Sequence, residues 1–206
     1  MATPRSPFRF LTSSCAASCR ATNGKRSHRG AALRNAGAEV FVQGRADHVM
    51  PTTLFTLGYQ QRSIDEFVAI LGEHEIDVLI DVRETAWSHK PGFSKSAFAA
   101  ALAGAGVEYV HADFAGNPKW LRSNADSHGE CLELYDRYLD DFAEIVRAFD
   151  RLVAELHAAG KRVCITCFER HADDCHRAIL AHRWKAKRGR QVRHLAVEGC
   201  RRLQTA

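Results

Sequence analysis

The sequence has no apolar run that approaches the ~18 residues needed to cross a bilayer, and no clear apolar core of a secretory signal. It also has no internal repeat and no low-complexity tract, so repeat architectures are excluded. We therefore predict a cytoplasmic protein without membrane contact. In a reducing compartment, the seven cysteines are expected to remain free thiols rather than form disulfides.

Acidic residues are absent from the first 38 residues, which contain six Arg, one Lys and many Ser and Ala. This stretch has no sustained helical or strand period, so we predict a disordered extension over residues 1–49. Two interpretations of the extension stay open. It resembles an organellar transit peptide in composition, or the chain starts at Met50, directly before the first convincing strand. In the second case Cys15 and Cys19 have no role.

Charge is unevenly distributed along the chain. The formal charge of +5 comes from residues 1–49, with eight bases against two acids, because residues 50–206 carry 21 bases and 22 acids. Residues 50–176 hold 12 bases and 21 acids, whereas residues 177–206 hold nine bases and Glu198 alone. A basic C-terminal segment can attract phosphates, but a solvated helix face that balances the acidic body is the simpler interpretation.

Apolar runs of strand length alternate with segments of helical period from Thr53 onward, which is typical of parallel strands joined by helical crossovers. With 46% apolar residues the chain can bury one sizeable core. We therefore predict an α/β fold: one compact Rossmann-like domain over residues 50–206 with a mostly parallel sheet. The expected strands are 53–57, 77–81, 107–111, 162–167 and 191–195.

Helix signals lie between these strands. Ser63 and Glu66 have the spacing of a capping box, and Ser94 or Ser96 is expected to cap a second helix. A long helical stretch is predicted from about residue 132 to 158, interrupted near Asp140. The last helix is predicted over 178–187, where the helical spacing of Trp184 favours a place in the core.

Loops that follow three of the strands carry polar side chains, over residues 58–62, 83–90 and 167–177. Ligands of an open α/β sheet bind at the carboxyl ends of its strands, so we expect these loops to converge on one cleft. A fourth loop, over residues 112–130, is too long for a plain connection. It is predicted to be a lid, a binding loop or a partly helical insert.

Basic side chains in these loops indicate an anionic ligand. The residues expected to bind it are Arg62, Arg83, Lys90, Asn117 and Arg177. Arg can grip a phosphate or carboxylate with two parallel hydrogen bonds. Each base alone can instead pair with a nearby acid such as Asp81, and only their shared edge favours a binding role.

The segment CFERHADDCHR, residues 167–177, carries the chemistry. Asp173 or Asp174 is expected to be the N-cap, which would place Cys175, His176 and Arg177 in the first helical turn. There the unpaired N–H groups and the helix dipole favour a thiolate. Cys175 is thus a candidate nucleophile, although buried packing as a small hydrophobe stays an alternative.

Cys167 ends a strand, so its thiol is expected to enter the same cleft, with Glu169 as a general acid or base. Cys167, His171, Cys175 and His176 have the residue types of a zinc site, but neighbours on a helix project in different directions. We predict no metal and no cofactor. Cys164 and Cys167 form a CxxC inside a strand, which argues against a thioredoxin-type redox motif.

Five motifs, TLGYQQRSIDEF, LIDVR, KPGFSK, VHADFAGNPKWLR and CFERHADDCHR, resemble in that order the motifs of the domain of unknown function 488 family, over about residues 53–195. The resemblance implies a compact α/β domain with a polar pocket, and it supplies no activity. The positions that it picks out are Gly58, Arg62, Asp81, Arg83, Gly116, Asn117, Cys167, Glu169, Cys175, His176 and Arg177. LIDVRETAW also resembles a rhodanese strand end, but the later loop is longer and lacks the rhodanese glycine.

Three hypotheses follow. The first is a cysteine-dependent hydrolase or transferase acting on a phosphate-bearing small molecule or nucleic acid, with Cys175 or Cys167 as nucleophile and Glu169 and His176 as acid/base partners. The second is a non-catalytic nucleic-acid-binding module that uses the basic segment 183–193. The third is rhodanese-like sulfur transfer. The sequence predicts no particular oligomeric state.

Overall fold

A computed structural model describes residues 52–187 and 189–195 of the chain. The extension over residues 1–49, with Cys15 and Cys19, lies outside the described residues, and so do Met50 and Glu198. The predictions for them are therefore neither confirmed nor contradicted. Among the described residues no helix is long and apolar enough to cross a membrane.

The described elements alternate between strands and helices, as expected. In chain order they are β1 (Thr52–Gly58), α1 (Ile64–Glu73), β2 (Val78–Asp81), α2 (Lys95–Gly104), β3 (Glu108–His111), the 3-10 helix η1 (Asp113–Ala115), α3 (Lys119–Arg122), α4 (His128–Asp141), α5 (Ala143–Ala158), β4 (Val163–Cys167), α6 (His176–Lys185) and β5 (Arg190–His194). The sheet order is β3-β2-β4-β1-β5, and every neighbouring pair is parallel. The predicted α/β fold is confirmed, and each expected strand matches to within one residue at either end.

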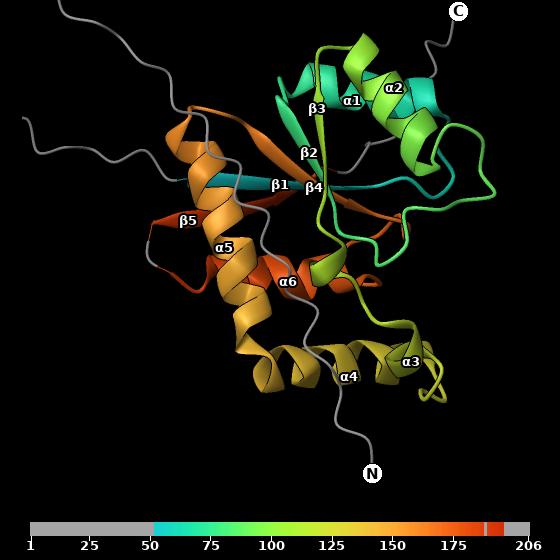
Figure 1. The fold of residues 1–206 in the computed structure, drawn as a ribbon, viewed down its shortest axis with the longest axis vertical. Helices are drawn as coiled ribbons and strands as arrows, with labels where there is room; N and C mark the ends of the chain where they lie inside the picture. The colour runs from blue at the N-terminus through green and yellow to red at the C-terminus, as the bar shows by residue number, and fades with distance from the viewer. Residues whose placement is uncertain (1–51, 188, 196–206) are drawn as a thin grey trace, which may run out of the picture. The chain divides into compact units, whose positions relative to one another are not determined.

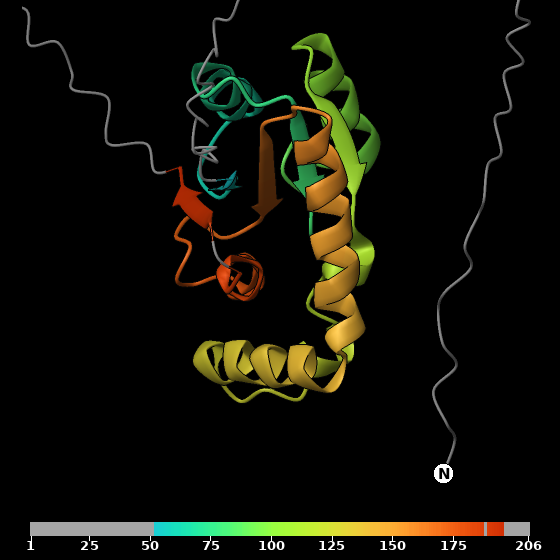
Figure 2. The ribbon, with the colours of Figure 1, turned by 90° about the vertical axis from the view of Figure 1, so that its left-hand side faces the viewer.

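Successive residues of the central strands face two separate cores, because side chains alternate along a strand. Val78 and Ile80 of β2 join the core covered by α4, α5 and α6. Leu79, between them, joins the core covered by α1 and α2. Figure 1 shows α1 and α2 in the upper part of the view, level with β2 and β3, and α6 and α4 below the strands; Figure 2 again shows α6 and α4 below the strands. Burial on both faces explains why these strands read as continuous apolar runs.

Local signals explain where the helices begin and end. The capping box is formed: Ser63 Oγ accepts from Glu66 N at 3.1 Å, and Glu66 Oε2 accepts from Ser63 N at 2.7 Å. The predicted interruption of the long helix occurs at Phe142, which ends α4 and begins α5. The fourth loop contains η1 and α3, so it is the partly helical insert of the three alternatives.

Two glycines allow backbone segments to approach one another closely. A Cβ atom at Gly58 would lie 1.8 Å from the carbonyl oxygen of Glu169, and one at Gly116 would lie 2.3 Å from the amide nitrogen of Glu84. Real Cβ atoms do not tolerate such contacts with backbone. Gly58 therefore lets the end of β1 lie against the loop after β4, and Gly116 lets the insert lie against the loop after β2.

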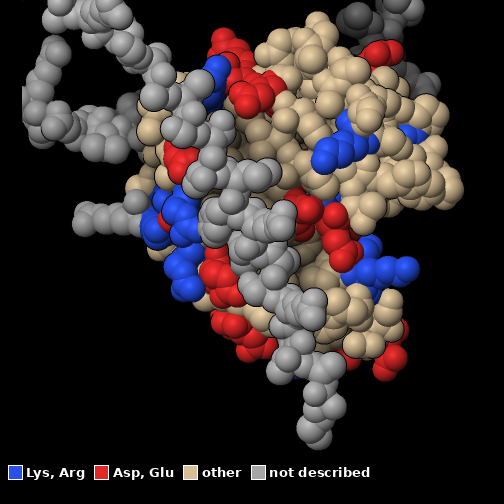
Figure 3. Space-filling view, viewed as in Figure 1, with Lys and Arg blue, Asp and Glu red and all other residues tan. Residues whose placement is uncertain are grey.

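Three bases of the C-terminal segment, Arg183, Lys187 and Arg190, pair with acids of α4 and α5. Arg183 forms ion pairs with Asp136, at 2.7 Å, and with Asp140. Lys187 and Arg190 both pair with Asp150. Figure 3 shows Lys and Arg side chains beside Asp and Glu side chains on the flank where α5 and β5 lie. This supports the balanced helix face, and Trp184, which is 1% exposed, packs in the core as expected.

Replacing Gly58 with alanine should destabilise the protein strongly, by ~3 kcal/mol or more, because the new methyl group meets backbone that cannot rotate away. Gly72 is the matched control: it lies in α1, and a Cβ atom there would meet nothing within 4 Å. G72A should raise the free energy of unfolding by ~0.5–1 kcal/mol through helix propensity. Urea unfolding of both variants measures the difference, and equal effects would refute the close-approach explanation.

Candidate functional site

A cavity of about 660 Å³ lies at the carboxyl ends of β1, β2 and β4. The residues that line it include Tyr59 from the first loop, Arg83 and Lys90 from the second, and Cys167, Glu169 and His176 from the third. The three loops therefore converge on one cleft, as predicted. Asn117 of the insert and the first turns of α4 complete its walls.

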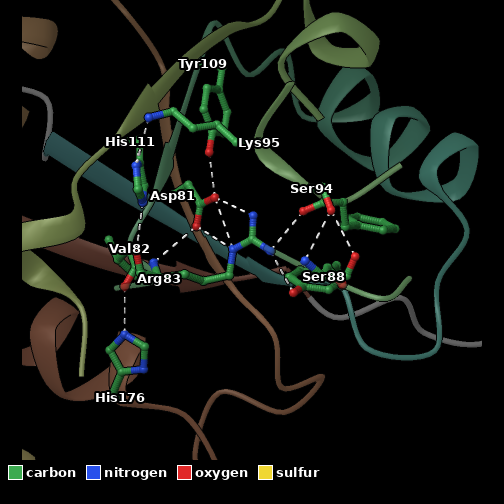
Figure 4. A network of polar contacts seen from close by, with 11 residues as sticks. Asp81, Val82, Arg83, Ser88, Ser94, Lys95, Tyr109, His111 and His176 are labelled. Atoms are coloured by element: carbon green, nitrogen blue, oxygen red, sulfur yellow. Dashed lines mark hydrogen bonds and ion pairs between the residues drawn. The ribbon is translucent and has the colours of Figure 1, made fainter. Parts of the chain in front are cut away.

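A buried ion pair fastens the second loop to the sheet (Figure 4). Arg83 Nε donates to Asp81 Oδ1 at 2.8 Å, Arg83 Nη2 lies 2.6 Å from Asp81 Oδ2, and the two side chains are 7% and 0% exposed. Arg83 Nη1 donates to the hydroxyl of Tyr59 at 2.8 Å and to the carbonyl of Phe93 at 3.0 Å. Tyr109 O–H donates to Asp81 Oδ2 at 2.7 Å. The pair thus connects the end of β2 with Tyr59, which follows β1, and with Tyr109 of β3.

The electrostatics of Arg83 make it an anchor rather than a free anion-binding group. Burial alone would lower the pKa of its guanidinium, but the hydrogen bonds that it donates to Asp81 and the charge of that carboxylate outweigh burial and raise the pKa. Its backbone carbonyl also bonds to His111 Nε2 at 2.9 Å, and His111 Nδ1 lies 3.2 Å from Lys95 Nζ (Figure 4). With most of its donors engaged, Arg83 holds the cavity wall in place.

Arg62 and Arg177 also have a structural role, because their guanidinium groups donate hydrogen bonds to backbone carbonyls. Arg62 Nη1 donates to Gly58 O at 3.0 Å, and Arg177 donates from Nη1 to Glu169 O at 2.6 Å and from Nη2 to Arg170 O at 3.1 Å. They are 5% and 1% exposed, and neither is among the described residues that line the cavity. The four predicted bases were expected to face one cavity together. Arg62 and Arg177 do not, because their guanidinium groups bond to carbonyl groups of the loops.

Lys90 is different among the four predicted bases. Its Nζ donates to Tyr59 O at 3.0 Å, it lines the cavity, and an ammonium group carries three N–H donors. Two donors are therefore available to a ligand oxygen.

A thiol and an imidazole meet at the wall of the cavity. His176 Nδ1 lies 3.6 Å from Cys167 Sγ, and His176 Nε2 lies 2.9 Å from the carbonyl oxygen of Val82. A carbonyl can only accept a hydrogen bond, so Nε2 carries a proton, and in the neutral form of the ring the lone pair of Nδ1 faces the thiol. Cys167 and His176 are 4% and 8% exposed, and both line the cavity.

Cys175 does not have the environment that the sequence predicted. It is the N-cap of α6, in an extended conformation, instead of a residue of the first turn capped by Asp173 or Asp174. Its side chain is 1% exposed, within the core beneath the cavity, and burial raises the pKa of its thiol well above the ordinary range. The expectation of a thiolate activated by the helix N-terminus was wrong, because the thiol turns into the core.

The expectation that Cys175 and His176 project apart was also wrong. Cys175 precedes the helix in an extended conformation. The rotation of ~100° between successive helical residues therefore does not turn its side chain away from that of His176. Cys167, Cys175 and His176 each bring one metal-ligating atom within 4.8 Å of the others, and all three residues are buried. His171, the fourth residue of the zinc set weighed from the sequence, is exposed and does not join them.

Two polar groups at the cavity have an atom without a hydrogen-bond partner among the described residues. One is Glu169, whose Oε2 is buried. The other is Asn117, 6% exposed, whose Nδ2 donates to Cys131 Sγ at 3.3 Å while Oδ1 has no partner. Buried polar atoms are normally satisfied, so unpaired ones beside a cavity favour a ligand or water there.

Several cavity residues escaped the sequence-based prediction. Cys131 approaches from α4, far along the chain, and no motif indicates it. Tyr59 directly follows Gly58 at a strand end, a position that could have indicated it. Two exposed aromatic rings, Trp87 at 60% and Phe168 at 43%, flank the cavity and stand directly in the predicted loops.

The family model described as Domain of unknown function DUF488 matches residues 63–184. This range is more than half of the 206 residues and contains the loops after β2 and β4, with Cys167, Cys175 and His176. No curated protein and no solved structure is found to match the chain.

Breaking the buried ion pair should be costly. Asp81→Asn leaves the charge of Arg83 buried without its partner, and we expect the free energy of unfolding to fall by ~3–5 kcal/mol. Glu133→Gln is the control, because it removes the exposed pair of Glu133 with Arg137 and should leave urea unfolding unchanged within error. Similar unfolding curves for D81N and the unaltered protein would show that the pair does not hold the loop.

Proposed function

The chain belongs to the family described as Domain of unknown function DUF488, and on the geometry of its cleft we propose that it is a cysteine-dependent hydrolase or transferase. Cys167 is the nucleophile and His176 its general base. The observation that carries the proposal is the 3.6 Å approach of Cys167 Sγ to His176 Nδ1 at the cavity wall, with the other ring nitrogen held by Val82 O. A nucleophile, a base and a group that orients the base are the parts of an activated nucleophile.

Cys167 takes the role of nucleophile in preference to Cys175 because of access. Cys167 lines the cavity, whereas Cys175 is 1% exposed and is not among its described lining residues. Burial also raises the pKa of Cys175 and so opposes formation of its thiolate.

The proton balance is simple. Cys167 gives its S–H proton to His176 Nδ1 as the sulfur forms a bond to the electrophilic centre of the substrate. The resulting imidazolium protonates the leaving group, and water or an acceptor then displaces the enzyme sulfur, with Glu169 positioned to accept the proton. Burial would lower the pKa of His176, but hydrogen bonds to Cys175 and to Val82 O are among the effects that outweigh burial and raise it. The imidazole is therefore able to hold the proton.

The substrate that suits this cavity is anionic and phosphate-bearing, such as a nucleotide or a nucleic-acid segment. Lys90 has two N–H donors available for a phosphate oxygen. Helix α6, which is ten residues long, begins at the same edge of the sheet, and the unpaired N–H groups of its first turn favour an anion there. The exposed rings of Trp87 and Phe168 offer faces on which a base can stack.

Non-catalytic nucleic-acid binding through the segment 183–193 has less support. Arg183, Lys187 and Arg190 are engaged by acids, so less positive charge is available to phosphates. Sulfur transfer would use the same Cys167 thiol as a persulfide carrier. A thiosulfate:cyanide assay distinguishes it from attack on a phosphate-bearing substrate.

In reduced, chelator-treated protein, iodoacetamide should modify Cys167 at least about tenfold faster than Cys175, because one unit of thiol pKa alone changes the thiolate fraction by that factor. Peptide-resolved mass spectrometry measures both rates. His176→Gln keeps an N–H group for Val82 O but removes the base, so it should slow the reaction of Cys167. Cys131, which also lines the cavity but accepts a hydrogen bond from Asn117 instead of facing His176, is the internal control. Faster modification of Cys175, or a Cys167 rate indifferent to H176Q, would contradict the assigned roles.

Nucleoside monophosphates are expected to raise the melting temperature of the protein. Lys90→Met should weaken their binding about tenfold or more, the effect of losing one hydrogen bond to a charged group. Lys95→Met is the matched control, since Lys95 bonds to His111 and is not among the described residues that line the cavity. Isothermal titration calorimetry provides the affinities, and equal losses in the two variants would reject Lys90 as the phosphate ligand.

A further inference from the structure

The proposed mechanism uses Cys167 and His176 but gives no role to Cys175, whose thiol is buried against both. We propose that Cys167, Cys175 and His176 form a binding site for a soft divalent cation, Zn²⁺, and that the bound cation removes Cys167 from reaction. The site would thus be a zinc-operated inhibitory switch on the thiol that the proposed function places at the reaction centre. Metal binding itself does not depend on that function.

One pair of ligand atoms already has the separation that zinc requires, and the third atom lies close to both. Zn–S bonds of ~2.3 Å and Zn–N bonds of ~2.0–2.1 Å at tetrahedral angles place sulfur and nitrogen about 3.6 Å apart, and two sulfurs about 3.8 Å apart. Cys167 Sγ and His176 Nδ1 are separated by 3.6 Å. All three ligand atoms lie within 4.8 Å of one another, so a small movement of Cys175 completes the set.

The imidazole is already in the tautomer that a metal needs. Histidine binds a metal through an unprotonated nitrogen, and the other nitrogen usually donates to a carbonyl or carboxylate that fixes the ring. His176 Nε2 donates to Val82 O at 2.9 Å, so in the neutral ring the unprotonated nitrogen is Nδ1, which faces Cys167. No ring rotation is required for binding.

The charges of the ligands also suit a divalent cation, because Cys167 and Cys175 are 4% and 1% exposed and as thiolates could balance its charge inside the protein. Two thiolates would neutralise one Zn²⁺, with release of two protons. Thiolate and imidazole ligands select Zn²⁺ against Mg²⁺ and Ca²⁺, which prefer oxygen.

The three residues leave the fourth coordination position of a tetrahedral zinc ion open, which indicates reversible zinc binding. Cys167 and His176 both line the cavity, and so does Glu169, whose Oε2 has no partner among the described residues. Structural zinc sites have four protein ligands, whereas three ligands and an accessible position are typical of sites that exchange a ligand. Zinc would therefore enter from the cavity and compete there with the substrate for Cys167.

Cobalt is the spectroscopic probe for the site. The reduced, metal-free full chain, titrated with Co²⁺, should develop a sulfur-to-cobalt charge-transfer band that saturates at one equivalent and is abolished by Zn²⁺. Cys175→Ser and Cys167→Ser should each lose most of this band. Cys131→Ser should keep it, and so should a triple replacement of Cys15, Cys19 and Cys200 by serine. Circular dichroism of each metal-free variant checks its folding.

Zinc protection tests the inhibitory role. Saturating Zn²⁺ should slow iodoacetamide modification of Cys167 by at least about tenfold, and in C175S the ratio of rates without and with zinc should fall towards one. Absence of the cobalt band in the unaltered protein, or its persistence in folded C175S, overturns the metal site. Failure of the proposed nucleophile gives a different result: Cys167 is then unreactive even in metal-free protein, whereas the cobalt band remains.

Discussion

The buried ion pair of Asp81 with Arg83 supports the rest of the site. It lies at the end of β2 and connects Tyr59 after β1 with Tyr109 of β3. Val82 is the residue between the paired side chains, so its carbonyl oxygen has a fixed direction. That oxygen holds His176, and His176 in turn faces Cys167. A single continuous set of contacts therefore runs from the end of β2 to the thiol of Cys167.

The arginines of this protein show why a cluster of bases in sequence need not be a binding site. The loops after parallel strands leave carbonyl groups without sheet partners, and buried carbonyls need donors. Arg62 and Arg177 supply those donors, as the bonds to Gly58 O and Glu169 O show. What remains for a ligand is smaller and more varied: an ammonium, a carboxamide, a carboxylate and a thiol.

Much of the architecture could be predicted from sequence because its signals are local. Strand bounds, the capping box at Ser63 and the edge where the loops meet all follow from periodicity and neighbouring residues. Side-chain directions in the last loop could not be predicted, because they depend on where α6 begins. The N-cap is Cys175 instead of Asp173 or Asp174, and the thiol that was expected in the first helical turn lies in the core. The contact of Asn117 with Cys131 was equally inaccessible, since it depends on how the insert folds back.

The two ring nitrogens of His176 reach the ends of two neighbouring strands, with Val82 following β2 and Cys167 ending β4. Both contacts of His176 therefore depend on the position of α6 along its axis and on its rotation about that axis. A shift of the helix by one residue would move the ring by ~1.5 Å and turn it by ~100°. The length of the segment between Cys167 and His176 thus helps to set the distance between the thiol and the imidazole. An insertion in this segment would change that distance even if every chemical group were retained.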